Sequence, residues 1–326
     1  MKRTGRVFRG SSGLYWVQVA GEPQPHAVRL KGTLKKELVY SESASRARRV
    51  VQTRKRRVTD PVTVGDLVVF DDETLLIERV EPRTTELART APSSTEQHVL
   101  VANLDALYCV VAAANPQPNL WILDRFLVVA ENQRIEAEIV VNKIDLALSE
   151  AATRAQFAAY GRIGYPLHFA SARRGDGIDA LRAGMAGRLS AFAGNSGVGK
   201  SSLLNAIQPG LSLKTGMIGE TTHKGRHTTT QAQLVPILDG DAWLADTPGL
   251  RQLDFWQIEA GEVENGFREI REIAPACQFG DCTHRGEPGC AVRAAVDRGE
   301  VDARRHASYV QLYEELVNGD ARREMG

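Results

Sequence analysis

The sequence predicts a multidomain protein with an N-terminal β-barrel, a central α/β domain and a small α-helical C-terminal domain. Three observations predict this order. Residues 1–90 consist mostly of short strand-like pieces, and from about residue 100 apolar runs alternate with helix-like stretches. After about residue 265, a turn rich in cysteine precedes two helix-like segments. We place the domains at 1–92, 93–264 and 265–326 of this 326-residue chain.

The N-terminal domain is predicted from four strand-like pieces, which are separated by Gly, Pro and polar residues. They lie at 13–21, 26–32, 64–71 and 75–81. Strands of this length in fewer than 100 residues favour a small closed barrel of the oligonucleotide-binding (OB) type. The stretch 41–60 is dense in Arg and Ser and poor in apolar residues, so we expect it to be a loop.

Charge is distributed unevenly along the chain. Residues 1–60 hold fifteen Lys or Arg and four Asp or Glu, a local net charge of +11, so the remaining 266 residues carry −10. This segregation favours a polyanionic partner for the N-terminal domain, although a solvated basic face has the same composition. No apolar run approaches the length of a membrane span, and no apolar segment typical of a secretory signal follows the basic N-terminus. We expect a cytoplasmic protein.

The central domain is predicted from continuous apolar runs that end in polar or glycine-rich turns. The runs and their turns cover 106–115, 138–145, 166–171, 188–197 and 242–249, and helix-like stretches cover 120–133, 149–164 and 200–209. This alternation predicts a parallel sheet covered on both faces. Ligands of such sheets bind at the carboxyl ends of the strands, where these turns lie.

The first of these turns to carry chemistry is a phosphate loop. Residues 194–201 match G-x-x-x-x-G-K-[ST] between a predicted strand and a predicted helix. Lys200 would supply charge to the β- and γ-phosphates and the Ser201 hydroxyl would ligate Mg²⁺. A purely structural glycine-rich turn is the alternative. The predicted phosphate-binding residues are Gly194, Asn195, Ser196, Gly197, Val198, Gly199, Lys200, Ser201 and Ser202.

A second turn, Asp246-Thr247-Pro248-Gly249, follows about 45 residues later at the end of a predicted strand. Asp246 is placed to hold Mg²⁺ through water, and the Gly249 N–H is placed to sense a γ-phosphate. The tetrapeptide alone is a common turn. Its spacing from the phosphate loop favours the nucleotide interpretation.

Two further turns favour guanine over adenine. The Asp145 carboxylate can accept hydrogen bonds from guanine N1–H and N2–H₂, a donor pair that adenine lacks. Lys143 would lie along the base, and Asn142 would tie this segment to the phosphate loop. At Ser171-Ala172, a backbone N–H can donate to the guanine O6. Together these motifs predict GTP as the nucleotide.

These elements resemble those of translation-factor and Ras-related GTPases, but N-K-I-D and S-A here precede the phosphate loop. The chain therefore resembles a circularly permuted GTPase. With its basic N-terminal segment and its C-terminal Cys/His cluster, it is similar over essentially its whole length to the ribosome small-subunit-dependent GTPase family. The resemblance implies a monomer that binds the small ribosomal subunit and its rRNA, and hydrolyses GTP during late maturation. Two alternatives are an RNA-binding protein that holds nucleotide structurally and a P-loop ATPase or kinase, against which Asp145 argues.

The resemblance also identifies a switch at 225–230. Five threonines are chemically eligible to ligate Mg²⁺, namely Thr221, Thr222, Thr228, Thr229 and Thr230, and the resemblance favours Thr229. Leu250 stands where Ras-like enzymes carry a water-positioning glutamine, so we expect slow hydrolysis without a partner. His227 is the best candidate to position the water in place of that glutamine. The alternatives are that His227 has a structural role or contacts RNA. Gly197 stands where potassium-dependent GTPases carry asparagine, which argues against dependence on a monovalent ion but does not exclude it.

The C-terminal domain carries a predicted metal site. Its three thiolates and one imidazole form a closed tetrahedral set suited to one structural Zn²⁺, and they come from Cys277, Cys282, His284 and Cys290. No ligand position is left for water, so catalysis at the metal is not expected. The alternative is an unrelated cluster of buried thiols. We expect Cys109 to pack in the core and His306 to lie on a helix surface.

Overall fold

The computed structural model describes residues 1–11, 13–32, 36–40, 50–55, 61–90, 97–210, 232–246 and 258–324. These form two compact units, and each is described by itself. The first comprises Met1–Leu104 and Gly225–Gly249, and the second comprises Asp105–Lys224 and Leu250–Gly326. In the described part of the chain, no helix is both long and apolar enough to cross a bilayer.

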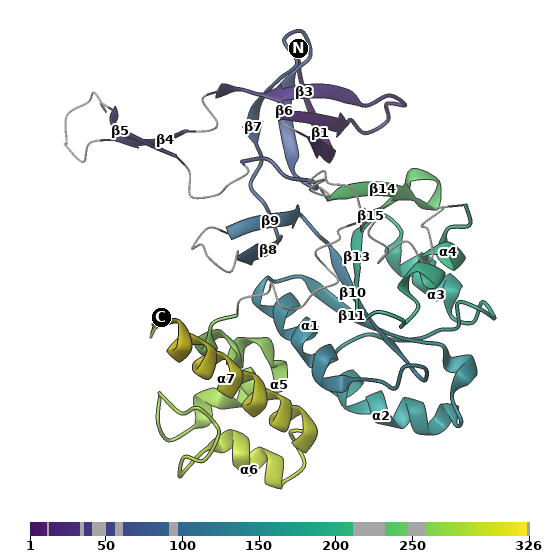
Figure 1. The fold of residues 1–326 in the computed structure, drawn as a ribbon, viewed down its shortest axis with the longest axis vertical. Coiled ribbons are helices and arrows are strands. Elements are labelled where there is room, and N and C mark those ends of the chain that lie inside the picture. The colour runs from purple at the N-terminus through teal and green to yellow at the C-terminus, as the bar shows by residue number, and fades with distance from the viewer. Residues whose placement is uncertain are drawn as a thin grey trace, which may run out of the picture. The chain divides into compact units, whose positions relative to one another are not determined.

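The first unit contains eleven strands in its described residues (Figure 1). They are β1 (Lys2–Ser11), β2 (Leu14–Gln18), β3 (His26–Leu30), β4 (Lys36–Tyr40), β5 (Val50–Lys55), β6 (Leu67–Asp71), β7 (Leu76–Val80), β8 (Glu86–Thr90), β9 (Gln97–Ala102), β14 (Gln233–Ile237) and β15 (Ala242–Asp246). A 3₁₀ turn, η3 (Leu238–Gly240), joins the last two. The predicted strands at 13–21, 26–32, 64–71 and 75–81 are confirmed as β2, β3, β6 and β7.

Five of these strands pair in a closed ring, in the order β1-β2-β3-β7-β6 and back to β1. The β3–β7 pair is parallel and the other four are antiparallel. Alternate side chains point inward, as the period of a strand requires. Together with Val62, which precedes β6, they build a core from Val7, Tyr15, Val17, Val28, Val68, Phe70 and Ile77.

Strand β1 was not among the predicted strands, because its inward-facing positions are not all occupied by apolar residues. One of them is Gly5, which is buried against β2. A Cβ at Gly5 would lie 2.5 Å from Cγ1 of Val17, so the close approach of the two strands requires glycine. Several of the remaining β1 residues are basic, which conceals the strand pattern.

The loop predicted over 41–60 is wrong for Val50–Lys55, which form β5 and pair antiparallel with β4. The β-branched residues Val50, Val51 and Thr53 favour an extended backbone, and pairing with β4 satisfies its polar groups. High Arg content alone therefore did not indicate a loop there. Residues 41–49 and 56–60 lie outside the described part of the chain.

The hairpin β14–β15 belongs to the same unit as the strand ring. Strand β14 pairs antiparallel with β15 and also with β1. Gln233 is the shared residue, since it pairs with Arg9 on one side and with Asp246 on the other. Strands β8 and β9 form a separate antiparallel pair.

The second unit contains a four-stranded parallel sheet in the order β12-β11-β10-β13. Its strands are β10 (Ala106–Ala112), β11 (Glu136–Asn142), β12 (Leu167–Phe169) and β13 (Leu189–Ala193), and its helices are α1 (Leu120–Asn132), α2 (Glu150–Arg162), α3 (Ile178–Met185) and α4 (Lys200–Ile207), with a 3₁₀ turn η2 (Ile144–Leu146). Four of the five predicted runs form this parallel sheet, and every residue of β10 and β13 is buried. Residues 242–246 of the fifth run form β15, which pairs antiparallel with β14 in the first unit. The helices predicted at 120–133, 149–164 and 200–209 are α1, α2 and α4, whereas α3 was not predicted.

The C-terminal part of the second unit is helical. It contains α5 (Arg268–Ile273), α6 (Ala291–Asp297) and α7 (Ala303–Glu324), with 3₁₀ turns η6 (Ala260–Glu262), η7 (Glu264–Gly266) and η8 (Ala274–Ala276). The helical stripe Val301, Tyr309, Leu312, Tyr313 and Leu316 is buried or half-buried, as a packing stripe should be. Turn η7 packs directly on α1, because a Cβ at Gly266 would lie 2.4 Å from Cγ1 of Val128.

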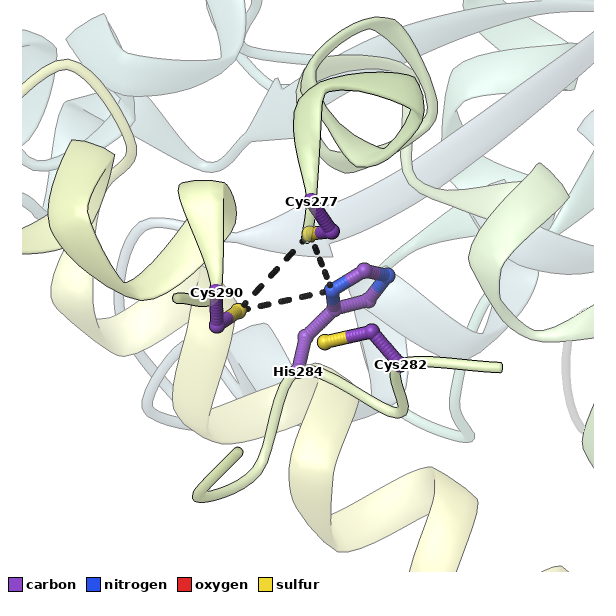
Figure 2. Close-up of side chains that lie close together, drawn as sticks. All are labelled: Cys277, Cys282, His284 and Cys290. Atoms are coloured by element: carbon purple, nitrogen blue, oxygen red, sulfur yellow. Dashed lines mark hydrogen bonds between the residues drawn. The ribbon is translucent and has the colours of Figure 1, made fainter. Parts of the chain in front are cut away.

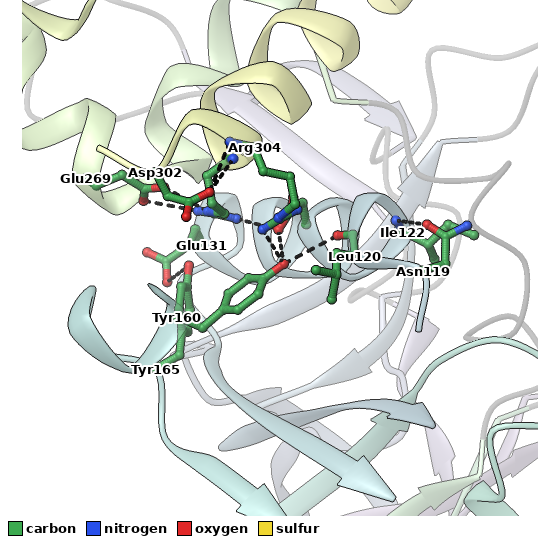
Figure 3. Close-up of polar contacts among 11 residues, drawn as sticks. Asn119, Leu120, Ile122, Glu131, Tyr160, Tyr165, Glu269, Asp302 and Arg304 are labelled. Carbon is green, nitrogen blue, oxygen red and sulfur yellow. Dashed lines mark hydrogen bonds and ion pairs between the residues drawn. The ribbon is translucent and has the colours of Figure 1, made fainter. Parts of the chain in front are cut away.

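A buried ionic network joins α7 to α1, α2 and α5 (Figure 3). The Asp124 carboxylate accepts hydrogen bonds from Arg304 at 2.8 Å and from Arg305 at 2.7 Å. It also accepts one from the Tyr160 hydroxyl at 2.6 Å, and Glu269 accepts a second bond from Arg305 at 2.7 Å. Burial alone lowers the pKa of Arg305, but Asp124 and Glu269 outweigh it and raise that pKa. The helical C-terminal part is therefore fixed to the sheet domain by matched charges.

Candidate nucleotide site and metal centre

Three of the predicted nucleotide-binding turns meet at the carboxyl ends of the parallel strands. The Asn142 amide lies between the other two turns: its Nδ2 donates to the Val198 carbonyl at 2.9 Å, and its Oδ1 accepts from the Ala172 N–H at 3.3 Å. Asn142 is itself buried. The expected tie between the N-K-I-D turn and the phosphate loop is thus present, and the same side chain reaches the S-A turn.

Glycine is required in the phosphate loop at both ends of the turn. Gly194 has φ 144° and Gly199 has φ 94°, values that side chains rarely permit. A Cβ at Gly194 would lie 2.3 Å from the Val110 carbonyl, and one at Gly199 would lie 2.3 Å from Nδ2 of Asn142. The loop therefore packs against β10 and the N-K-I-D turn, and it leads directly into the N-terminus of α4, where N–H groups favour anions.

Both site lysines are folded onto the phosphate loop. Lys200 donates to the Gly194 carbonyl at 2.5 Å and to the Asn195 carbonyl at 2.8 Å. Lys143, at φ 61°, donates to the Gly197 carbonyl at 2.7 Å and to the Asn115 carbonyl. Ser196 and Gly197 are exposed at the tip of the loop, Val198 is buried, and Ser201 and Ser202 lie in the first turn of α4. An ammonium group surrounded by carbonyls at this distance is well placed to move to phosphate oxygens.

Asp145 is positioned by the neighbouring turn. Its Oδ1 accepts a hydrogen bond of 2.6 Å from the Ser171 hydroxyl, and Ser171 is completely buried. The Ser171 N–H donates to the Asp176 carbonyl at 2.9 Å, whereas the Ala172 N–H makes a longer bond of 3.3 Å to Oδ1 of Asn142. Of the two predicted N–H donors to guanine, Ala172 is therefore the more easily released. Sequence reasoning assigned a backbone role to this turn and missed the Ser171 side chain.

Other predicted residues lie elsewhere. Asp246 ends β15 in the first unit, half-buried opposite Gln233. The proposed catalytic and switch residues His227 and Thr229, the other eligible threonines, Gly249 and Leu250 fall outside the described residues. The buried Cys109 thiol donates to the Leu107 carbonyl, and burial raises its pKa, as expected of a core cysteine.

The four predicted metal ligands meet in space (Figure 2). Their ligand atoms all lie within 4.8 Å of one another. Nδ1 of His284 is 3.5 Å from the Cys277 sulfur and 3.6 Å from the Cys290 sulfur, and those two sulfurs are 4.0 Å apart. A tetrahedral zinc ion with bonds of about 2.3 Å to sulfur and 2.05 Å to nitrogen requires S···N of about 3.6 Å and S···S of about 3.8 Å. The donor set therefore fits such an ion in number, chemistry and spacing.

Residues around the cluster orient the ligands. Nε2 of the buried His284 lies 3.0 Å from the Glu264 carboxylate, which turns Nδ1 toward the thiols. His306 lies on α7, as predicted, and its Nε2 is 2.9 Å from the His284 carbonyl. Glu264 was missed because it precedes the first cysteine by thirteen residues, and no motif links the two.

The turn between Cys282 and Cys290 is closed by a carboxylate. Glu287 accepts backbone hydrogen bonds from Thr283 at 2.8 Å and from Arg285 and Gly286 at 3.0 Å each. The hydrogen bond from the Thr283 hydroxyl, together with these backbone donors, holds the pKa of Glu287 well below its usual range. This compact turn holds His284 in the left-handed conformation, at φ 58°.

Comparisons with known proteins agree with this site. The family model described as RsgA GTPase matches residues 80–256. Proteins named small ribosomal subunit biogenesis GTPase RsgA are 42% identical in Gemmatimonas aurantiaca and 40% identical in Moorella thermoacetica, and each alignment covers 96% of this chain and 97% of the relative. The crystal structure of YjeQ from Thermotoga maritima matches with a TM-score of 0.75 at 33% identity, covering 97% of this chain and 99% of that one. The structure of YloQ, a circularly permuted GTPase, matches with a TM-score of 0.71 at 29% identity, covering 98% and 96%.

Proposed function

The chain belongs to the RsgA GTPase family, and from this premise we propose that it hydrolyses GTP on the small ribosomal subunit, assists late maturation of that subunit, and leaves after hydrolysis. It is a GTP hydrolase with a circularly permuted GTPase fold. The observation that carries the proposal is the meeting of the N-K-I-D, S-A and phosphate-loop turns around Asn142.

We propose that guanine is recognised by Asp145 and the Ala172 N–H, with Lys143 along the base. The bond from Ser171 supports this, because it fixes one carboxylate oxygen of Asp145. Residues 194–202 would bind the phosphates through backbone N–H groups and Lys200. In this arrangement Lys200 exchanges the carbonyls of Gly194 and Asn195 for phosphate oxygens.

The reaction transfers the γ-phosphoryl group to water. The bond between the γ-phosphorus and the bridging oxygen breaks, GDP leaves with that electron pair, and the water loses a proton. We propose that His227 orients or deprotonates this water. Mg²⁺ accompanies the nucleotide in this class and neutralises charge on the β- and γ-oxygens. Ser201 and Thr229 would hold it directly, Asp246 would act through water, and the Gly249 N–H would sense the γ-phosphate.

The cysteine cluster is proposed to hold one structural Zn²⁺. All four donors belong to protein side chains, so no position is left for a substrate. The metal would cross-link the segments that carry Cys277, Cys282 with His284, and Cys290. Such a site, with reduced cysteines, is expected in the cytoplasm.

The strand ring is proposed to be an OB-type barrel that contacts rRNA. Its closed order, with one parallel pair between β3 and β7, and the charge of +11 over residues 1–60 support this. We retain 1–92, 93–264 and 265–326 as the proposed functional domains and propose that the protein acts as a monomer.

GTP turnover titrated with purified small ribosomal subunits tests the proposal. We expect slow turnover alone, because Leu250 cannot orient water, and saturable stimulation by the subunits. Purified large subunits, at the same RNA mass, are the matched control. Equal turnover with both subunits, or no stimulation by either, would contradict the proposed partner.

A further inference from the structure

A groove lies within the first unit, between strand β1 of the ring and the hairpin β14–β15. Its volume is about 280 Å³, and its aromatic wall is formed by Phe8 and Trp243. Their rings stack with centroids 6.1 Å apart and an angle of 28° between planes. Both rings are half-buried, so part of each faces solvent.

Polar and basic side chains border this aromatic wall. Arg9 and Gln233, both exposed, lie opposite each other on β1 and β14. The Arg9 guanidinium also lies over the Trp16 ring, 5.0 Å from its centroid. Of the described residues that line the groove, none is acidic. The groove thus combines flat aromatic surface, an accessible cation and an amide, and its described lining carries no acidic side chain.

This chemistry fits an unpaired nucleobase. Bases stack on aromatic side chains regardless of sequence, while arginine contacts the backbone phosphates. The volume of about 280 Å³ lies just below the range of small-ligand pockets, roughly 300–1,000 Å³, and suits one planar base. An extended peptide would also stack on aromatic residues, but the excess of +11 over residues 1–60 favours a polyanion.

We propose that this groove binds an unpaired base of RNA, stacked on Trp243, with its phosphate at Arg9. The proposal rests on the proposed RNA-binding function of the strand ring and names one site for it. The groove also has a connection to catalysis, since β15 carries both Trp243 and, three residues later, Asp246. Gln233, which borders the groove, pairs directly with Asp246. An RNA base in the groove would therefore contact the hairpin that ends at Asp246, the residue proposed to act on Mg²⁺ through water.

The test measures binding of a fluorescent single-stranded oligoribonucleotide at fixed salt, by anisotropy, with the full chain. A second oligomer of the same length lacks bases and keeps the phosphates. We expect wild type to prefer the intact oligomer, and Trp243→Ala to bind it roughly 5- to 150-fold more weakly, as loss of one stacked base implies. Trp243→Phe should retain most of the affinity. Phe279→Ala, which truncates an exposed ring in the metal-site turn, is the matched control and should bind like wild type.

Two results would overturn the groove assignment. One is equal binding of the intact and base-free oligomers by wild type, which needs no variant to fold. The other is unchanged affinity in Trp243→Ala. Basal GTP turnover and stimulation by small subunits are measured on the same samples. Absence of stimulation in wild type would contradict the proposed partner of the enzyme, whereas the oligomer comparison separately decides whether the groove binds a base.

Discussion

The Ser171 hydroxyl donates a hydrogen bond of 2.6 Å to Oδ1 of Asp145, across two turns that are 26 residues apart in the chain. The bond occupies one of the two carboxylate oxygens. Ser171 is itself fixed, since its oxygen accepts the Arg174 N–H at 3.1 Å. The direction in which Asp145 presents its acceptors is therefore determined by the protein before a base arrives.

Asp145→Asn should change the base preference of the nucleotide site from guanine toward xanthine. The amide keeps one acceptor and gains a donor, so it loses a bond from guanine and can donate to the 2-carbonyl of xanthine. A hydrogen bond to a charged group is worth about 1.5–3 kcal/mol. We expect GTP affinity to fall roughly 10- to 150-fold and affinity for xanthosine triphosphate to rise, measured by competition with a fluorescent nucleotide.

Ser171→Ala is the matched variant for this exchange. It removes the orienting bond and leaves the carboxylate in contact with the base, so GTP binding should weaken less than in Asp145→Asn, by about 2- to 12-fold for a loss of about 0.5–1.5 kcal/mol, without a gain for the xanthine nucleotide. A gain in xanthosine triphosphate affinity in Ser171→Ala would show that Asp145 does not set the base preference.

His227→Ala should separate binding from turnover. If the imidazole positions or deprotonates water, its loss leaves GTP and GDP affinity within about twofold and reduces subunit-stimulated turnover by roughly 10²- to 10⁴-fold. His306→Ala, which removes an imidazole on α7, controls for loss of a histidine elsewhere. Equal stimulated rates in His227→Ala and wild type would refute the catalytic assignment.

Glu264→Ala should weaken the proposed metal site although Glu264 is not a ligand. Its carboxylate lies 3.0 Å from Nε2 of His284 and fixes the tautomer in which Nδ1 faces the metal. We expect zinc affinity to fall about 10- to 100-fold in competition with a chromophoric chelator. Glu272→Ala, an exposed carboxylate on α5, is the control. The prediction fails if the two variants retain zinc equally well.

Asp124→Ala should destabilise the junction between α1 and α7. The substitution leaves the fully buried Arg305 with one carboxylate partner in place of two, and removal of one member of a buried charge network costs about 3–5 kcal/mol in the free energy of unfolding. Glu315→Ala, which removes an exposed ion pair with Arg125 between the same helices, should cost no more than about 1 kcal/mol. Urea unfolding measures both, and similar costs would contradict the importance given to burial.

The sequence predicted which turns would meet at the edge of the parallel sheet, because its motifs are local. Each motif occupies a few consecutive residues at a strand end, and a parallel sheet brings such ends together without further information. Contacts between distant side chains were beyond this reasoning. Nothing near Ser171 indicates that its hydroxyl, rather than its backbone, would reach Asp145, and no pattern connects Glu264 with His284.

Strands were harder to predict where composition concealed the pattern. Strand β1 needs Gly5 at an inward position, and β5 carries the basic residues expected of a loop. Both are stabilised by pairing with partners that propensity alone does not reveal. The buried network around Asp124 was also missed, since its charges resemble ordinary surface residues of helices until the helices pack.

Asn142 shows how a mutational scan could mislead. Its amide joins the Val198 carbonyl to the Ala172 N–H, and Gly199 has no side chain where that amide passes. Replacing Asn142 would weaken the proposed binding of the base and of the triphosphate at the same time. Affinity data alone would then identify Asn142 as a ligand contact, although its observed role is to connect two turns of the protein by hydrogen bonds.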